Sequence, residues 1–380
     1  MKIAIITNSS SYEPRVHMAA DFFSRQGHQV FMILSDFIHR EKIKGRPAEE
    51  NSVFIDTIPY KHNMSWKRLY SHYDFSKKVY TYIKNEDYDL IYVLIPANSL
   101  IRYMALYKKH SKKNLIVDIL DLWPESLPFN LIKKIWPVSI WSAMRNNNLK
   151  YADLIITECN LYQKELKAYL THSPVINVYW PRETEENPVL NRVKNDDQIH
   201  ICYLGSINHI IDINFVVKLL VSIQNYKAIK LHIIGDGENK DELLERLKSA
   251  DINTTFYGSV YDESEKMKVL ASCDYGLNIM KHSVCVGITM KSVDYLYAGL
   301  RLLNNIKGDT WQIVETDGIG YNCTYENMDI IAQKIAREVT GKEEKEAARQ
   351  CYMRNFSRNA YGNSMKRCLE IIERIQERSE

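Results

Sequence analysis

The chain has 380 residues, of which 45% are hydrophobic and 26% are charged, and this composition is typical of a folded globular protein. No apolar run approaches the ~18 residues that a membrane-spanning helix needs, and the first residues lack the apolar length and cleavage pattern of a signal peptide. We therefore expect a cytoplasmic protein, and the length predicts two domains or three.

Charge is distributed unevenly along the chain. Residues 1–182 contain 25 Lys and Arg against 17 Asp and Glu, a net charge of +8, whereas residues 183–380 contain 25 against 30, a net charge of −5. Basic clusters at residues 65–84, 108–113 and 131–136 also contain aromatic side chains. Such clusters form either solvated faces of amphipathic helices or a surface that contacts an anionic partner such as a membrane.

The seven cysteines are scattered, without a C-x-x-C pair or a histidine cluster at zinc spacing. They predict free, buried thiols, and we expect no metal site.

In the first half, apolar runs of strand length alternate with amphipathic segments of helix length. The predicted strands are 3–7, 30–34, 90–95, 115–120 and 154–157, and the predicted helices are Pro14–Gln26, Tyr73–Asn85, Ser99–Lys109 and Asn160–Leu170. This alternation is typical of a parallel sheet that is covered by helices on both faces.

The second half repeats the pattern after a polar segment with two prolines, residues 179–198. Its predicted strands are 199–205, 230–237, 254–260, 275–280 and 301–305, and its predicted helices are Asn214–Gln224, Lys240–Ala250, Glu263–Ala271 and Met290–Ala298. We therefore predict an α/β protein with two Rossmann-like, doubly wound domains, 1–182 and 183–361, that face each other across a cleft, and a C-terminal helix at 362–380.

Polar residues follow two predicted strands of the first half. Ser9–Ser11 come after the first strand and either cap a turn or hold an anion or a sugar, and Arg15 lies just inside the following helix. After the fourth strand, Asp121 is the candidate proton acceptor, and Trp123 and Glu125 are candidate sugar contacts. Ser10, Arg15, Trp123 and Glu125 are therefore the predicted acceptor-binding residues.

Two alternatives apply to this segment. Asp118 lies inside the apolar strand pattern and suits a structural role. Two acids would also fit paired-carboxylate glycosidase chemistry, but their separation in space does not follow from sequence spacing. The loop after the first strand has no G-x-G-x-x-G motif, so a nicotinamide or flavin cofactor is not indicated.

In the second half, Gly205 ends a strand, and Ser206, Asn208 and His209 lead into a helix that begins near Asp212. Backbone N–H groups and a helix dipole at such a place favour a phosphate. Gly258 ends a later strand, where a residue without a side chain lets a flat base approach, and Tyr261 is placed to flank that base.

Lys291 and Asp294 are one helical turn apart in the segment "MKSVDYLYAGL". They form either an ordinary surface ion pair or part of a ligand site.

The order of the motifs in the second half resembles retaining glycosyltransferases of the GT-B fold, family 4. The motifs are a strand that ends at Gly205, then "IIGDG", "TTFYGSV", "CDYGLNIM" and "GITMKSVDYLYAGLRLL". Family members commonly have G-x-G, F-x-G and K-x-x-E-Y-x-A-x-G-x-P at the corresponding places. "RQGHQVFMIL" and "DLWPESL" look like first-domain segments of bacterial members that build surface polysaccharides.

The resemblance implies that the first domain binds the acceptor, that the second binds a nucleotide-sugar donor, and that the last helix crosses back onto the first domain. Lys291 would contact the donor diphosphate and Asp294, where the family usually has Glu, would hold the ribose hydroxyls. Gly258 and Val260 would line the base, and Gly205 would approach the phosphates.

The chain departs from the family pattern at the donor sugar. The family often has a second Glu eight residues before the position of Asp294, and here this residue is Val286. The resemblance then leaves recognition of the donor sugar to backbone groups or to His282 and Cys285.

Two further departures concern charge. The Arg and Lys that family members carry shortly after the Gly205 position are absent, so Lys291 meets more of the phosphate charge or His209 helps. The usual proline near the end of the last motif is Arg301, which could be a surface residue.

We therefore predict a retaining, metal-independent hexosyltransferase without a cofactor, with Asp121 and Lys291 as catalytic residues. The donor would be a nucleotide-diphosphate sugar, UDP by analogy, and the acceptor a saccharide or lipid-linked glycan in surface-polysaccharide synthesis. The basic first half predicts a peripheral contact with an anionic membrane, and no nucleic acid is expected as a partner. Two alternatives stay open, a nucleotide-sugar epimerase of the same fold and a non-catalytic subunit of another transferase.

Overall fold

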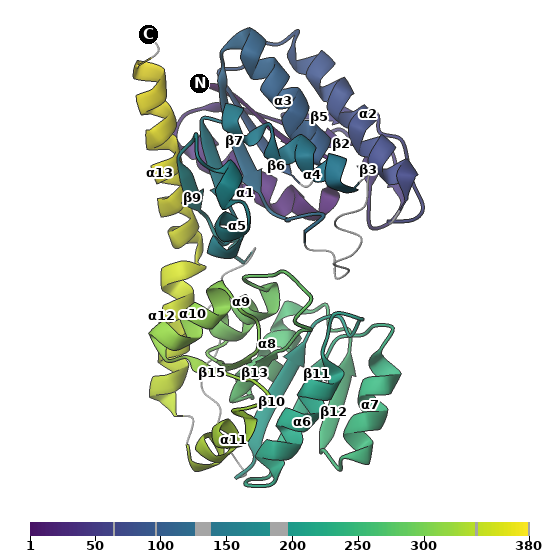
Figure 1. Cartoon of the computed structure of the whole chain (residues 1–380), viewed down its shortest axis with the longest axis vertical. Helices are drawn as coiled ribbons and strands as arrows, with labels where there is room; N and C mark the ends of the chain where they lie inside the picture. The colour runs from purple at the N-terminus through teal and green to yellow at the C-terminus, as the bar shows by residue number, and fades with distance from the viewer. Residues whose placement is uncertain (64, 96, 126–137, 183–196, 339–340, 379–380) are drawn as a thin grey trace. The chain divides into compact units, whose positions relative to one another are not determined.

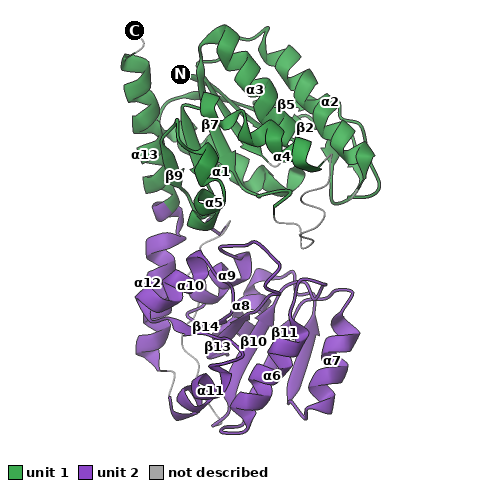
Figure 2. Cartoon of the chain, viewed as in Figure 1, with its two compact units in different colours: residues 1–180, 361–380 green, residues 181–360 purple. Residues whose placement is uncertain are grey.

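The computed structural model describes residues 1–63, 65–95, 97–125, 138–182, 197–338 and 341–378 (Figure 1). The chain forms two compact units, one of Met1–Trp180 with Tyr361–Glu380 and one of Pro181–Ala360 (Figure 2). The first unit therefore ends two residues before the predicted boundary and takes in the C-terminal helix.

The first unit contains a seven-stranded, wholly parallel sheet in the order β5-β2-β1-β6-β7-β8-β9. Its strands are β1 Lys2–Thr7, β2 Gln29–Ser35, β5 Ser52–Ile55, β6 Leu90–Ile95, β7 Asn114–Ile119, β8 Leu154–Thr157 and β9 Val175–Asn177, and a separate antiparallel pair is β3 Phe37–Ile38 with β4 Ile43–Lys44. Its α-helices are α1 Glu13–Arg25, α2 Trp66–Ile83, α3 Asn98–Ser111, α4 Val138–Asn146, α5 Asn160–Glu165 and α13 Arg358–Glu377, and short 3₁₀ helices are Ser10–Tyr12, Leu149–Tyr151 and Lys167–Tyr169.

Helices cover both faces of this sheet. All six residues of β6 are buried, as expected for a strand of a parallel sheet covered on both sides. Leu90, Tyr92 and Leu94 belong to one core cluster with α1 and α13. Because side chains alternate along a strand, Ile91 and Val93 pack on the opposite face, where α2, α3 and α4 lie side by side (Figure 1).

A buried ion pair lies inside the first unit. The Arg15 side chain is 0% exposed, and its Nε donates to Asp118 Oδ2 at 2.8 Å. Its Nη2 donates to Asp118 Oδ1 at 3.2 Å and to the Val178 carbonyl at 3.0 Å. The Tyr92 hydroxyl donates to the same carboxylate at 2.6 Å. We therefore assign Arg15 and Asp118 to the core, and Arg15 is not placed to meet an acceptor in this structure.

The second unit contains a six-stranded parallel sheet in the order β12-β11-β10-β13-β14-β15. Its strands are β10 Ile199–Leu204, β11 Ile229–Ile234, β12 Thr254–Gly258, β13 Tyr275–Asn278, β14 Arg301–Asn304 and β15 Gly320–Asn322. Its helices are α6 Ile213–Gln224, α7 Lys240–Ser249, α8 Glu263–Ala271, α9 Met290–Tyr297, α10 Asp309–Asp317, α11 Met328–Arg337 and α12 Lys342–Asn355.

Both sheets are doubly wound, as the sequence predicts. In the second unit the strand order reverses between β10 and β13, which are neighbours, and in the first it reverses between β1 and β6. Ligands of open parallel sheets bind beyond the carboxyl ends of the strands at such a point. The cleft between the two domains stays a prediction.

Arg301, which the sequence suggested as a surface residue, is buried on β14, and its Nη1 donates to Glu338 Oε2 at 2.6 Å.

Within the described residues, no helix combines the length and the apolar character that crossing a bilayer requires.

Candidate functional site

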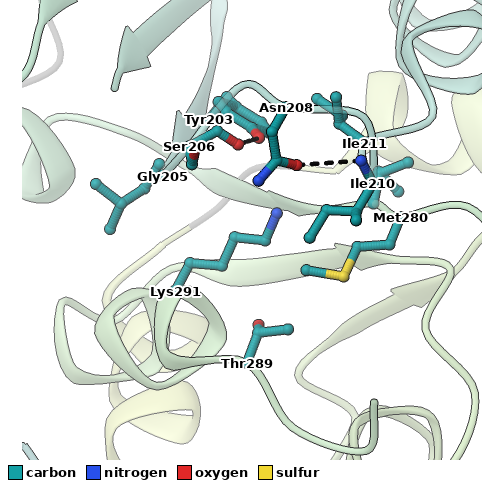
Figure 3. A pocket seen from close by; sticks show the side chains of 11 residues that line it. Tyr203, Gly205, Ser206, Asn208, Ile210, Ile211, Met280, Thr289 and Lys291 are labelled. Atoms are coloured by element: carbon teal, nitrogen blue, oxygen red, sulfur yellow. Dashed lines mark hydrogen bonds between the residues drawn. The ribbon is translucent and has the colours of Figure 1, made fainter. Parts of the chain in front are cut away.

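A cavity of about 220 Å³ opens at the reversal point of the second sheet (Figure 3). Its walls come from the end of β10, from the loop that follows β10, from the loop before α9, and from α9 itself. The lining residues are Tyr203, Leu204, Gly205, Ser206, Asn208, Ile210, Ile211, Ile279, Met280, Thr289 and Lys291. Four predicted donor-binding residues, Gly205, Ser206, Asn208 and Lys291, are thus brought together from positions up to 86 residues apart.

The loop after β10 turns sharply at Gly205. This residue has φ = +117°, a conformation that other residues rarely adopt, and the space where a Cβ would stand is open. The neighbouring loop after β11 packs against it so closely that a Cβ on Gly235 would lie 2.0 Å from the Gly205 carbonyl oxygen. The Gly205 N–H donates to the Ile234 carbonyl at 2.9 Å. The glycines of "IIGDG" therefore support the turn that lines the cavity.

Two backbone donors in this turn have no acceptor. Within the described residues, neither the Ser206 N–H nor the Asn208 N–H donates a hydrogen bond. The Asn208 side chain accepts from the Ile210 N–H at 3.1 Å, which holds the loop in place. The Asp212 side chain accepts from the Phe215 N–H at 3.0 Å and caps α6, which begins at Ile213. Free N–H groups in such a turn are suited to an anion.

Lys291 extends from α9 into the cavity, and its Nζ points toward Asn208 (Figure 3). The Nζ lies 4.8 Å from the centroid of the Tyr203 ring, a cation–π contact. No carboxylate of the described residues lies within 4.0 Å of this ammonium group, and that includes Asp294. Desolvation lowers the pKa of Lys291 to about 8. The cavity therefore contains a cation that still lacks its counter-charge.

Hydrogen bonds fix the N-terminus of α9 and hence the position of Lys291. The Thr289 hydroxyl accepts from the Ser292 N–H at 3.2 Å, as an N-cap does, and donates to Asn278 Oδ1 at 2.7 Å. Asn278 begins a ladder of amides that continues through Asn304 and Asn322 on the next two strands, with N···O distances of 2.9 and 2.8 Å.

Tyr295 fastens the same helix to the end of β10. Its buried hydroxyl accepts from the Leu204 N–H at 2.7 Å, directly before the turn at Gly205. The ring fits here because residue 276 is a glycine, where a Cβ would lie 2.3 Å from Tyr295 Cγ. The Tyr295 side chain therefore aligns the turn after β10, which contains Ser206 and Asn208, with helix α9, which carries Lys291.

Asp294 points to a different set of partners. Its carboxylate is 16% exposed and forms ion pairs with Arg182 and, at 3.6 Å, with Lys266. Arg182 and Lys266 also pair with Glu263, and Arg182 Cζ lies 4.3 Å from the centroid of the Tyr297 ring. Lys291 and Asp294 are therefore not an ion pair in this structure, and Asp294 does not line the cavity.

The remaining predicted donor-binding residues lie outside the cavity lining. His209 is exposed and its Nδ1 lies 3.2 Å from Glu238 Oε1. Gly258 has φ = +67°, and its carbonyl accepts from the Gly235 N–H at 2.8 Å, next to the turn. Val260 is partly exposed, and Tyr261 is 94% exposed. The two candidates for the donor sugar also lie outside it, with His282 exposed and Cys285 partly exposed.

In the first unit, two predicted residues border the same small cavity. Asp121 and Trp123 line it together with Arg68, Leu69 and His72. Of the other predicted acceptor residues, Arg15 lies in the core, and Ser10 and Glu125 contact other residues of the first unit. Ser10 Oγ accepts from the His39 N–H at 3.2 Å, and Glu125 pairs with the buried Arg145 at 2.5 Å.

Several residues of the donor cavity are absent from the sequence-based prediction. Tyr203, Met280 and Thr289 are lining residues, and Tyr295 and Arg182 act beside it. Thr289 could have been predicted from the sequence as an N-cap, since threonine is preferred directly before the first residue of a helix.

No protein-family model and no curated protein sequence matches the chain. Solved structures do match over almost the whole length. Sucrose-phosphate synthase from Thermosynechococcus elongatus has a TM-score of 0.71 at 12% identity, with 97% of this chain and 98% of that chain covered. The lipopolysaccharide outer core galactosyltransferase WaaB has a TM-score of 0.69 at 14% identity (97% and 99% covered), and Anabaena HepE in complex with UDP has 0.66 at 15% identity (97% and 100% covered).

The chain has the GT-B fold. At identities this low the comparisons establish the architecture of two Rossmann-like domains, and function has to be argued from the site.

Proposed function

We propose that the protein is a glycosyltransferase that takes a sugar from a nucleotide-diphosphate donor, with the diphosphate in the cavity beside Lys291. The observation that carries this proposal is that Lys291 lines one cavity with Ser206 and Asn208, and that within the described residues its ammonium group has no carboxylate partner and their N–H groups have no acceptor. A diphosphate supplies the missing negative charge and the missing acceptors. UDP is the preferred nucleotide, because HepE, which has the same fold, is solved with UDP.

The chemistry that we propose is transfer with retention, as in family 4. The acceptor hydroxyl attacks the anomeric carbon from the face that the diphosphate leaves, so that no enzymatic nucleophile is needed. Negative charge grows on the leaving diphosphate as the glycosidic bond breaks, and Lys291 stabilises it. Asp121 of the first unit would accept the proton of the acceptor hydroxyl, or hydrogen-bond to it.

Release of nucleoside diphosphate tests this function. Full-length protein is incubated with a panel of UDP-sugars and GDP-sugars, with and without saccharide acceptors, and free UDP or GDP is measured. We expect slow donor hydrolysis without acceptor and faster release with a suitable one, both lost in Lys291→Met. Tyr226→Ala, an exposed residue of the same unit outside the cavity, is the matched control. Lack of turnover with every donor would contradict the proposal.

The same experiment separates the two rival functions. An epimerase would convert the donor alone into a new nucleotide sugar without release of nucleoside diphosphate, which chromatography of the products detects. A non-catalytic subunit would bind the nucleotide without turnover and would restore the activity of a partner protein that co-purifies with it.

We also propose that the first unit binds to anionic membranes through the layer of α2, α3 and α4. Of the eight Lys and Arg in these three helices, Lys67, Lys77, Arg102 and Lys109 are exposed, whereas Arg145 is buried. On α2, Trp66 is 68% exposed and Tyr70 is 60% exposed, beside the exposed Lys67 and Lys77. Aromatic rings among cations on one surface favour the interface of an anionic bilayer.

Co-sedimentation with vesicles tests the membrane surface. We expect binding to vesicles that contain phosphatidylglycerol, little binding to phosphatidylcholine alone, and release by salt. Trp66→Ala with Tyr70→Ala should reduce binding severalfold, whereas Tyr169→Ala, an exposed aromatic residue outside this layer, should not. Equal binding by all variants would exclude this surface.

A further inference from the structure

Two cations contact the ring of Tyr60 in the first unit, and a third, Arg40, acts with them on the neighbouring His39. Arg40 and Lys42 lie in the turn between β3 and β4, and Arg68 lies in the first turn of α2. Lys42 Nζ is 4.8 Å and Arg68 Cζ is 6.0 Å from the centroid of the Tyr60 ring. The Tyr60 hydroxyl lies 2.7 Å from His39 Nδ1. We call Arg40, Lys42 and Arg68 the cationic cluster.

The cationic cluster has no counter-charge in contact. Across the described ranges, no carboxylate lies within 4.0 Å of the side-chain nitrogens of Arg40, Lys42 or Arg68, whereas two cations of the same segment are paired, Lys44 with Asp56 and Arg46 with Glu13. The cluster's own hydrogen bonds go to uncharged groups. Lys42 Nζ donates to Asn63 Oδ1 at 2.7 Å and lies 3.4 Å from His39 Nδ1. Arg40 Nε donates to Ser11 Oγ at 3.2 Å, and Arg68 Nη1 donates to the Asn63 carbonyl at 3.1 Å.

Burial, and then the neighbouring cations, lower the pKa values of two histidines beside the cluster. Desolvation, and then Arg68, Lys42 and Arg40, lower the pKa of His39 to about 4. Burial and Arg68 likewise hold the pKa of His72 well below its ordinary value. Both imidazoles are therefore neutral near pH 7 and add no positive charge. His72 is 7% exposed, and its Nδ1 has no hydrogen-bond partner within the described residues.

The cationic cluster adjoins the predicted acceptor residues. Arg68 and His72 line the same small cavity as Asp121 and Trp123. The turn that carries Arg40 is tied to the loop after β1, because the His39 N–H donates to Ser10 Oγ at 3.2 Å and Arg40 donates to Ser11. A molecule whose hydroxyl lies at Asp121 would thus present a neighbouring substituent to Arg68.

We propose that the cationic cluster is a subsite for a phosphate group of the acceptor, so that the acceptor is a phosphorylated saccharide; this rests on the proposed function. Arginine binds phosphate through two parallel hydrogen bonds, and lysine adds a point charge. A phosphate monoester carries about −1.5 to −2 charges at neutral pH, which suits three unpaired cations better than the single charge of a carboxylate.

Calorimetry with simple anions tests the subsite. Full-length Lys291→Met is titrated with glucose 6-phosphate, glucose, glucuronate and inorganic phosphate, so that the donor cavity does not contribute an anion site. We expect glucose 6-phosphate to bind at least ~10-fold more tightly than glucose and glucuronate, since one good charge-assisted contact accounts for about such a factor. Inorganic phosphate should compete with glucose 6-phosphate for the same site.

Charge-matched variants locate the subsite. Arg68→Gln or Lys42→Gln should weaken glucose 6-phosphate binding by ~10-fold or more. Lys77→Gln removes one exposed cation from the same helix and should change it less than ~2-fold. Equal binding of glucose and glucose 6-phosphate, or equal effects of Arg68→Gln and Lys77→Gln, would overturn the proposal. Tighter binding of glucuronate than of glucose 6-phosphate would overturn the assignment to phosphate.

The outcome is independent of the donor site. Failure of UDP to bind would contradict the proposed function while leaving these titrations unchanged. Conversely, normal donor turnover without any anion binding at the cationic cluster would contradict only this further inference.

Discussion

The titration of Lys291 gives a sharp prediction for ligand binding. A diphosphate requires the protonated ammonium group, and burial lowers its pKa to about 8 in the free protein. About 90% of the side chains are then charged at about pH 7 and about 3% at about pH 9.5, so the apparent Kd for UDP should rise about 30-fold over this interval. Burial raises the pKa of Tyr203, the ring in contact with Lys291, so this neighbour does not titrate there.

Isothermal titration calorimetry with UDP over this pH range is the assay. Lys291→Arg keeps its charge throughout, because a guanidinium is not deprotonated in proteins, and should lose most of the pH dependence. Lys291→Met should bind UDP ~10-fold or more weakly near neutrality and with a flat profile. If the Kd of Lys291→Met for UDP depends on pH as that of the wild type does, the titrating group lies elsewhere and the reasoning is refuted.

Three further predictions concern residues around the sites. Tyr295→Phe keeps the ring but leaves the buried Leu204 N–H without its acceptor. This variant should lower the free energy of unfolding by ~1–3 kcal/mol in urea denaturation, and it should weaken UDP binding in calorimetry. If Asp294 leaves its ion pairs to bind the ribose, Asp294→Ala should abolish the preference for UDP over 2′-deoxy-UDP in competition binding; an unchanged preference would exclude that role. Arg15→Met leaves Asp118 as an uncompensated buried charge and should cost ~3–5 kcal/mol in denaturant unfolding, with the UDP affinity of the folded protein unchanged.

The titration of Lys291 also affects the free energy of unfolding. The sign of this effect is opposite to that of a lysine whose pKa is raised by a salt bridge. The pKa of Lys291 is lowered in the folded state, so between about pH 8 and about pH 10.4 the unfolded chain binds more protons. The contribution of this residue therefore destabilises the fold at neutral pH, and the stability of the unliganded protein relative to Lys291→Met should rise through this window.

Hydrophobic periodicity predicted most of the central strands and helices. The helix Glu263–Ala271 has the predicted bounds, and the predicted Met290–Ala298 ends at Tyr297. Short edge elements such as β9 and β15 were not predicted, because three residues carry too little pattern. The start of α2 lies seven residues earlier than predicted, because Ser65, a good N-cap, accepts from the Arg68 N–H.

The candidate site was predictable only in part. The order of the motifs predicted that Gly205 and Lys291 lie close together, since the carboxyl ends of the strands of a parallel sheet lie at one edge. The side-chain partners did not follow from the pattern. Arg15 is buried against Asp118, and the carboxylate of Asp294 pairs with Arg182. These pairs were not predictable because they join segments that are distant in sequence.

The position of a bound nucleotide tests the central claim most directly. A crystal structure of the protein with UDP should show the diphosphate within hydrogen-bond distance of Lys291 Nζ and of the Ser206 and Asn208 N–H groups. A structure in which UDP is bound elsewhere, with Lys291 still facing Tyr203 in a cavity without phosphate, would contradict the account.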